Sequence, residues 1–273
     1  MTVHSLRLAE KSADCKLLTV NCQLRMYLSL IIPAYKEATR IEASLDKIFA
    51  YLANAPYDSE VIVVDDGSPD NSVEVIRAAF AKPFTPSGSD FTPSIQTRLI
   101  ELGKNAGKGA AVQAGMLDAK GVIRIFTDAD LSTPIHEIEK VIYAIEKEHY
   151  DVVVGSRALE GRTLVKVHQP IYREMMGRFF NMLVQIFVLR GIKDTQCGFK
   201  GFRGEVAEKI FTKQKVMGFS FDVEILYLAK KAGYKVKEVA VEWYNDERTT
   251  VGALSDSAKM FMELLKIRKL HKS

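Results

Sequence analysis

The chain has 273 residues, of which 47% are hydrophobic and 26% are charged, and its formal net charge at pH 7 is +4. This length can bury a substantial core, and the charge is too small to indicate a nucleic acid partner. The three cysteines, Cys15, Cys22 and Cys197, form neither a paired framework nor a metal-binding spacing, and no apolar run reaches the about 20 residues of a membrane span.

The first residues show no clear periodicity and no signal-peptide core. We therefore expect an N-terminal extension over 1–26 and a folded domain over 27–270. Apolar strand-like runs then alternate with helical patterns, which predicts right-handed crossovers and a mainly parallel sheet with helices on both faces. The expected strands lie at 27–34, 60–66, 97–102, 121–128 and 150–156, and the expected helices at 38–53, 68–80, 107–119 and 134–147.

The alternation ends after Ser156. We expect a single α/β domain whose first half, 27–156, binds a nucleotide and whose second half, 157–270, faces an acceptor. In the second half the pattern predicts a basic loop, a long helix at 170–190, a strand near 198–203, helices near 204–211 and 221–232, a strand at 235–242 and a last helix near 255–270.

Polar or glycine-rich segments follow all five strands of the first half. Because ligands of open α/β sheets bind at the carboxyl ends of the strands, these segments predict one common site. In chain order they read "PAYKE", "DDGSPD", "GKNAGKG", "DAD" and "GSR".

Asp128 and Asp130 stand one residue apart at the end of an apolar run, so in a strand both side chains would point to one face. Neighbouring carboxylates repel unless a cation joins them, and Mg²⁺ or Mn²⁺ typically binds one or two carboxylates together with substrate phosphates. The spacing predicts a metal held against a diphosphate. In the alternative interpretation, Asp130 or Ser132 caps a helix that begins at Pro134.

The other polar residues at the same edge can also be interpreted either as ligand-binding groups or as parts of the local structure alone. Asp65 and Asp66 in "VVDDGS" could bond a nucleobase or ribose, or they could belong only to an Asp-Gly turn. "GKNAGKGAA" supplies Lys104 and Lys108, but it has neither the Walker spacing nor the dinucleotide glycine pattern, which excludes simple NTPases and dehydrogenases. Arg157 suits contacts to phosphate, as do the following Arg162 and Arg173, unless they form a solvated basic loop.

Four motifs occur in the order and spacing of a known family: "SLIIPAYKEATRI", "VIVVDDGSPDNS", "NAGKGAAVQAG" and "FTDADLSTP". On these residues the chain resembles inverting glycosyltransferase family 2, which has the GT-A fold. Over about 28–270 it is most similar to the polyprenyl-phosphate hexosyltransferases, in particular the dolichyl-phosphate β-glucosyltransferases. The segments that carry this narrower resemblance are "VVVGSR", "IKDTQCGFKGFR", "GFSFDVEILYLAKKAGYKVKEVAVEW" and "SDSAKMFMELLKIR".

The resemblance implies metal-assisted transfer of glucose from UDP-glucose to a polyprenyl phosphate of the dolichyl type. The alternatives are GDP-mannose as donor, a protein or polysaccharide acceptor, and a module that senses nucleotide sugars without chemistry. Eukaryotic relatives begin with a membrane anchor, and no comparable apolar segment occurs here. We therefore expect a cytoplasmic protein associated peripherally with the cytoplasmic face of a membrane, through an apolar face of 170–190 and the basic C-terminal "KIRKLHKS".

The resemblance also implies roles for individual residues. Catalytic roles fall on Asp130, Arg157 and Asp222, and the metal ligands are Asp128 and Asp130. Contacts to the nucleotide sugar are expected from Pro33, Tyr35, Glu37, Asp65, Asp66, Lys108, Asp128, Ala129, Gln196 and Lys200, with Phe221 on the sugar side. Arg173 and Arg178 would meet the acceptor phosphate. Relatives carry a Gly-Ser-Lys loop where this chain has "NDERTTVG", so the chain departs from the family pattern at this loop.

Overall fold

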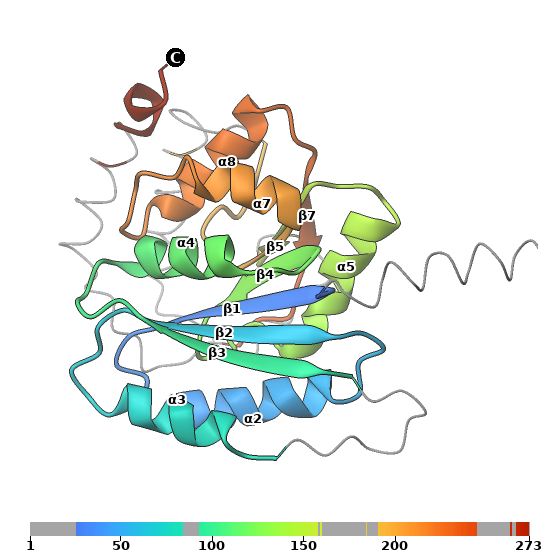
Figure 1. Ribbon diagram of the computed structural model, residues 1–273. Helices are drawn as coiled ribbons and strands as arrows, with labels where there is room; N and C mark the ends of the chain where they lie inside the picture. Colours follow the sequence, from blue (N-terminus) through green and yellow to red (C-terminus); the bar gives the residue numbers. More distant parts are fainter. Residues whose placement is uncertain are drawn as a thin grey trace, which may run out of the picture.

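The computed structural model describes residues 26–83, 93–157, 159, 184, 191–244, 263 and 266–272. Its centre is one seven-stranded sheet in the order β3-β2-β1-β4-β6-β5-β7 (Figure 1). The strands are β1 (Leu28–Ala34), β2 (Ser59–Asp65), β3 (Ile95–Glu101), β4 (Ile123–Thr127), β5 (Val152–Ser156), β6 (Phe199–Arg203) and β7 (Val236–Ala240). The single α/β domain predicted from the alternating pattern is confirmed.

Helices cover both faces of this sheet. They are α2 (Ile41–Leu52), α3 (Ser72–Phe80), α4 (Lys108–Asp118), the short 3-10 helix η1 (Ile135–Glu137), α5 (Ile138–Glu146), α7 (Gly204–Phe211) and α8 (Phe221–Lys231). Figure 1 shows α2 and α3 on one side of the sheet and α4, α7 and α8 on the other.

Alternation along β1 explains the two layers. Leu30 and Ile32 pack into the core formed with α2, α3 and α5, whereas Ile31 packs into the core formed with α4, α7 and α8. All seven residues of β1 and of β2 are buried, as expected for parallel strands with helices on both sides.

One strand runs against the others. β6 is antiparallel to both β4 and β5, while β1, β2, β3 and β4 pair in parallel with one another, as do β5 and β7. Because β6 is reversed, its amino end lies at the edge where β4 and β5 have their carboxyl ends. Residues that precede β6 therefore join the loops that follow the parallel strands.

Some predicted segments lie outside the described residues. These are most of the long helix at 170–190, most of the expected last helix, and the N-terminal extension. Among the described residues, no helix has both the length and the apolar character needed to cross a bilayer.

Candidate active site

The loop after β2 is tied to the loop before α4 by a carboxylate. Asp66 accepts hydrogen bonds from the backbone N–H groups of Ala106 (2.7 Å) and Gly107 (2.9 Å), and burial raises its pKa. The neighbouring Asp65 accepts a bond from Ser68 N through Oδ2, and its buried Oδ1 has no hydrogen-bond partner among the described residues. Asp66 therefore holds the "KNAGKG" loop in place, and the contact of either carboxylate with a base or ribose stays a prediction.

The two aspartates of the "DAD" motif lie beyond the strand. β4 ends at Thr127, and Leu131 has a positive φ of 49°. The expectation that a strand points Asp128 and Asp130 to one face is therefore wrong, because both residues lie in the turn that follows β4. Neither aspartate caps α5: η1 precedes that helix without a side-chain cap, and Asp130 Oδ1 instead accepts the N–H of Ser132 at 2.8 Å.

The two carboxylates have different partners. Asp128 Oδ1 forms an ion pair with Lys108 Nζ at 2.5 Å. The pKa of Asp130 is raised, first by burial and then by the charge of Asp128. The charged form of a buried carboxylate that lies beside another negative charge is stabilised by an added cation. Asp130 could thus hold a divalent metal with oxygen ligands, with Asp128 beside it.

A glycine before β6 closes the space next to Asp128. A Cβ atom at Gly198 would lie 2.0 Å from Asp128 Oδ2, which is far inside contact distance. The reversed strand thus brings backbone against the carboxylate, and only glycine leaves that carboxylate in its present position.

We expect a Gly198→Ala variant to lower kcat/KM for the donor by about 100-fold, because a displacement of about 1 Å in a catalytic group has an effect of this size. Steady-state kinetics with UDP-glucose, the donor expected from the sequence, would measure the change. Gly218→Ala is the control, since the nearest atom to its added Cβ, at 3.1 Å, is Oε1 at the flexible end of Glu263. Equal kinetics for Gly198→Ala and wild type would show that the Asp128 position is not critical.

A buried ion pair lies deeper on the same side. Lys200 on β6 has no exposed surface, and its Nζ donates to Asp222 Oδ1 on α8 and to the carbonyl of Cys197 at 2.6 Å. Burial raises the pKa of Asp222 even though the charges of Lys200 and Lys108 act to lower it. Lys200, Asp222, Lys108 and Asp128 thus form a group of alternating charges.

Arg157 has a partner that the sequence analysis missed. Its guanidinium donates to both oxygens of Asp194, at 2.8 and 3.0 Å, and its backbone N–H donates to the same carboxylate. Burial alone would raise the pKa of Asp194, but the Arg157 charge and these bonds hold it below its ordinary value. Glu238 on β7 in turn accepts the N–H of Asp194, and the centre of the Trp243 ring lies 5.4 Å from the guanidinium carbon. This arrangement fixes one cation at the sheet edge.

The other predicted residues lie around this edge with less specific contacts. Pro33 is buried and is the last residue but one of β1, Tyr35 is half-buried, and Glu37 is buried and paired with Arg40. Of the remaining residues, Ala129 is buried, Gln196 is half-buried, and Phe221 packs in the core against Phe126. Arg162, Arg173 and Arg178 lie outside the described residues.

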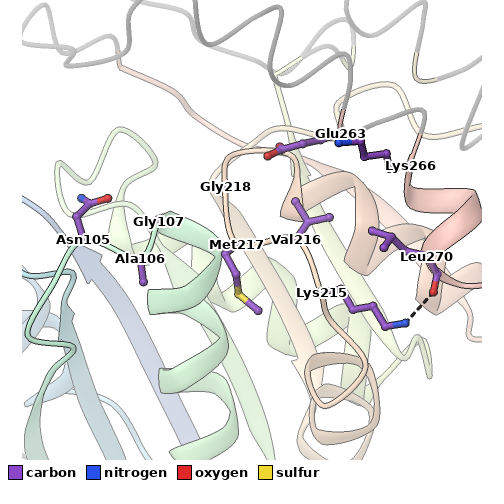
Figure 2. A pocket seen from close by; sticks show the side chains of 10 residues that line it. All are labelled: Asn105, Ala106, Gly107, Lys215, Val216, Met217, Gly218, Glu263, Lys266 and Leu270. Atoms are coloured by element: carbon purple, nitrogen blue, oxygen red, sulfur yellow. Dashed lines mark hydrogen bonds between the residues drawn. The ribbon is translucent and has the colours of Figure 1, made fainter.

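A cavity of about 450 Å³ lies beside the loop that Asp66 holds (Figure 2). Asn105 and Gly107 line one side of it, and the segment from Lys215 to Gly218 lines the other. The carbonyl of Met217 accepts the N–H of Gly109 at 2.8 Å, so this segment covers the beginning of α4, where Lys108 lies.

The chain matches the family model described as glycosyl transferase family 2 over residues 29–211. It is 40% identical to dolichyl-phosphate beta-glucosyltransferase ALG5C of Trichomonas vaginalis, over 91% of this chain and 73% of that protein. It is 34% identical to the dolichyl-phosphate beta-glucosyltransferase of Saccharomyces cerevisiae, over 89% of this chain and 74% of that protein. Glucosyl-3-phosphoglycerate synthase of Mycobacterium tuberculosis, in a crystal structure with Mn²⁺ and UDP-glucose, is 18% identical with a TM-score of 0.64, over 92% of this chain and 82% of that one. At that identity the likeness concerns the fold alone, and it confirms the predicted GT-A architecture.

Proposed function

Since the chain belongs to glycosyl transferase family 2, and is therefore a glycosyltransferase, we propose that it transfers glucose from UDP-glucose to a polyprenyl phosphate of the dolichyl type, with inversion and with the help of Mg²⁺ or Mn²⁺. The observation that carries the proposal is the similarity to dolichyl-phosphate beta-glucosyltransferases over about nine tenths of the chain. The carboxylates and fixed cations at one edge of the sheet support it, because they suit a diphosphate and a second phosphate.

The acceptor phosphate is anionic at neutral pH, so it needs no strong general base to attack the anomeric carbon. The surroundings of Asp222 are consistent with a reaction without a general base, since its carboxylate is buried and accepts a hydrogen bond from Lys200. We assign Asp222 and Lys200 to the wall of the sugar site. The task of the protein is then to hold nucleophile and leaving group in line.

The main obstacle to this reaction is the repulsion between the negative charges of the donor diphosphate and of the acceptor phosphate. Asp130, with Asp128 beside it, would hold a divalent cation, which when bound acts as a Lewis acid toward the leaving diphosphate. Arg157 would reduce the repulsion between donor and acceptor phosphates. Because both oxygens of Asp194 accept from one edge of the guanidinium, through Nε and Nη2, Arg157 is oriented before substrate binds. Lys108 would contribute a second positive charge on the donor side.

The acceptor is a membrane lipid, so the same proposal includes peripheral association with the cytoplasmic face of a membrane. The basic C-terminal residues support the proposed membrane association, because an anionic leaflet attracts cationic side chains.

The decisive experiment supplies radiolabelled UDP-glucose and GDP-mannose in parallel, each with and without polyprenyl phosphate and Mn²⁺. We expect chloroform-soluble label only from UDP-glucose with both polyprenyl phosphate and metal present. Chloroform-soluble label from GDP-mannose would identify GDP-mannose as the donor instead. Label transferred to protein or to a polysaccharide would indicate a different acceptor, whereas unreacted donor stays in the aqueous phase. Binding of UDP-glucose without any release of UDP would indicate a sensing module.

A further inference from the structure

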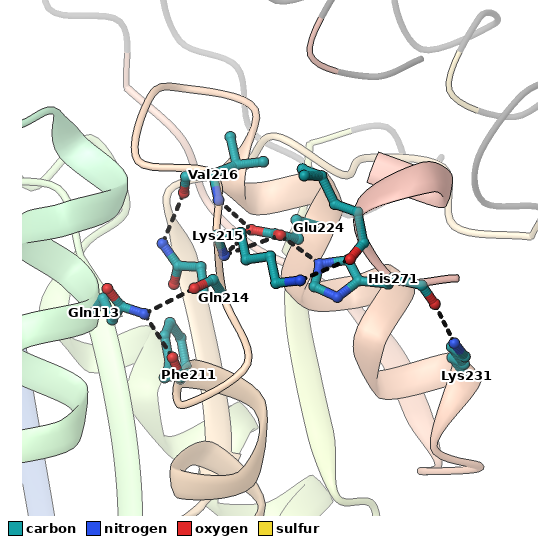
Figure 3. A network of polar contacts seen from close by, with 9 residues as sticks. Gln113, Phe211, Gln214, Lys215, Val216, Glu224, Lys231 and His271 are labelled. Carbon is teal, nitrogen blue, oxygen red and sulfur yellow. Dashed lines mark hydrogen bonds and ion pairs between the residues drawn. The ribbon is translucent and has the colours of Figure 1, made fainter. Parts of the chain in front are cut away.

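The C-terminal segment, here residues 266–272, is docked on α8 through a buried carboxylate (Figure 3). Glu224 has no exposed surface, and its oxygens accept the backbone N–H groups of Lys215 and Val216 and face Nε2 of His271 at 2.6 Å. Ile267 of the same segment is fully buried. The segment is therefore a packed part of the domain.

Two lysines donate hydrogen bonds to carbonyl groups at the end of this segment. Lys215 Nζ donates to the carbonyl of Leu270 at 2.7 Å, and Lys231 Nζ donates to the carbonyl of His271. Cations stabilise the carbonyl end of a helix, because its last carbonyl groups have no partner within the helix. These contacts tie the segment to the loop between α7 and α8 and to the last residue of α8.

The docked segment closes a groove of about 620 Å³ against α7, α8 and the loop between them. We call it the basic groove, because five lysines line it and no Asp or Glu is among its described lining residues. The lysines are Lys209, Lys213, Lys215, Lys231 and Lys272.

Three of these lysines have no counter-charge among the described residues. Within the part of the chain that the structure describes, no carboxylate forms an ion pair with the ammonium group of Lys209, Lys213 or Lys272, and all three residues are exposed. Like charges that gather without a carboxylate repel one another, and an anion placed among them would relieve that repulsion. The occupant that complements the basic groove is thus anionic.

The groove also has apolar walls. Ile210, Leu228 and Tyr234 line it between the lysines, and Leu270 at its border is 39% exposed. A small hydrated anion gains nothing from such walls, whereas a phosphate that carries a glycerol and acyl chains does. Three further basic residues of the C-terminal segment, Lys266, Arg268 and Lys269, are exposed next to the groove.

We propose that the basic groove binds the anionic headgroup of a membrane phospholipid and so holds the enzyme on the surface that contains its acceptor. The inference rests on the proposed function, in which the acceptor is a membrane lipid, and it names the site of membrane contact. Residues of the groove take no part in the transfer reaction.

The test is co-sedimentation of the full chain with vesicles of phosphatidylcholine alone and of phosphatidylcholine with phosphatidylserine. The groove variant is Lys209→Ser/Lys213→Ser/Lys272→Ser. The matched control is Lys47→Ser/Lys120→Ser/Lys147→Ser, which removes the same charge from exposed lysines outside the groove. Wild type and control should bind the phosphatidylserine vesicles and not the neutral ones, and the groove variant should bind them roughly a hundredfold more weakly, because each lysine near an anionic surface adds to the attraction.

Equal losses in the two triple variants would mean that only net charge matters, and would overturn the proposal. So would binding of wild type to neutral vesicles with the same affinity. Tight calorimetric binding of soluble glycerophosphoserine or inorganic phosphate without vesicle binding would assign the groove to a soluble anion instead. Glucosyl transfer to a short-chain polyprenyl phosphate in detergent should be the same in all three proteins. If transfer is absent from all of them, the proposed function fails while the vesicle result still decides the role of the groove.

Discussion

An Asp130→Asn variant is expected to lose glucosyl transfer by roughly 100- to 1,000-fold while its melting temperature stays close to that of the wild type. Asparagine has nearly the same shape, and its side-chain oxygen can still accept the N–H of Ser132. The substitution therefore removes the negative charge and leaves the turn intact. Transfer should fall because a neutral amide holds Mg²⁺ or Mn²⁺ far more weakly than a carboxylate does.

Two measurements separate this cause from a structural one. Calorimetric titration of UDP in the presence of Mn²⁺ should show tight binding to wild type, weak binding to the variant, and little difference between them once the metal is chelated. Asp46→Asn, which removes an exposed carboxylate of α2, is the control for loss of one negative charge. Turnover by Asp130→Asn equal to that of wild type would rule out a metal at this carboxylate.

The parallel half of the fold could be predicted because its strands are strongly apolar and its helices are amphipathic. The alternation of strands and helices also predicted that the loops after the strands meet at one edge of the sheet. It therefore predicted that Asp65, Lys108 and Asp130 lie near one another. The direction of β6 could not be predicted. Apolar periodicity within one strand contains no information about the direction of its neighbours, which long-range packing decides.

The residues missed at the site are those whose role depends on a distant partner. Asp194 lies 37 residues from Arg157, and no spacing rule connects them. The function of Asp66 in holding the loop at Ala106 depends on a contact across 40 residues. Sequence reasoning finds groups that follow strands, because topology alone brings those together. It does not find which of these groups bond to one another, as Asp66 does with Ala106. Nor does it find a pair such as Arg157 and Asp194, which meets only when the segment before the reversed strand is in place.

The second large effect concerns the stability of the buried pair of Lys200 and Asp222. Lys200→Met and Asp222→Leu should each lower the free energy of unfolding by about 3–5 kcal/mol, because each leaves one charge buried without its partner. The double variant should lose less than either single variant, since two apolar side chains of similar volume can replace a buried ion pair at little cost. Urea denaturation monitored by tryptophan fluorescence and circular dichroism would give the three values. A fully additive double variant would mean that the two charges do not interact.

A matched pair on the surface provides the comparison. Lys82 contacts Asp46 at 2.9 Å and Glu42 at 3.0 Å, and all three side chains are exposed. Lys82→Met should change stability little, because water and salt screen such contacts. Activity gives a further contrast, since the double variant at Lys200 and Asp222 should recover stability without recovering transfer if these residues form the wall of the sugar site.

The pH dependence of the Lys200→Met variant identifies which charge is left unpaired. Burial already raises the pKa of Asp222 in the folded chain, and loss of the Lys200 cation removes a group that acts to lower it. The folded state then holds a proton at pH values where the unfolded state has lost it. Since stability falls with rising pH wherever the folded state binds more protons, the variant should be closest to wild type in stability at acidic pH and should lose stability as pH rises through the raised pKa of Asp222. A stability difference from wild type that is the same at every pH would show that Asp222 is not the charge left behind, and that the loss comes from packing around Lys200.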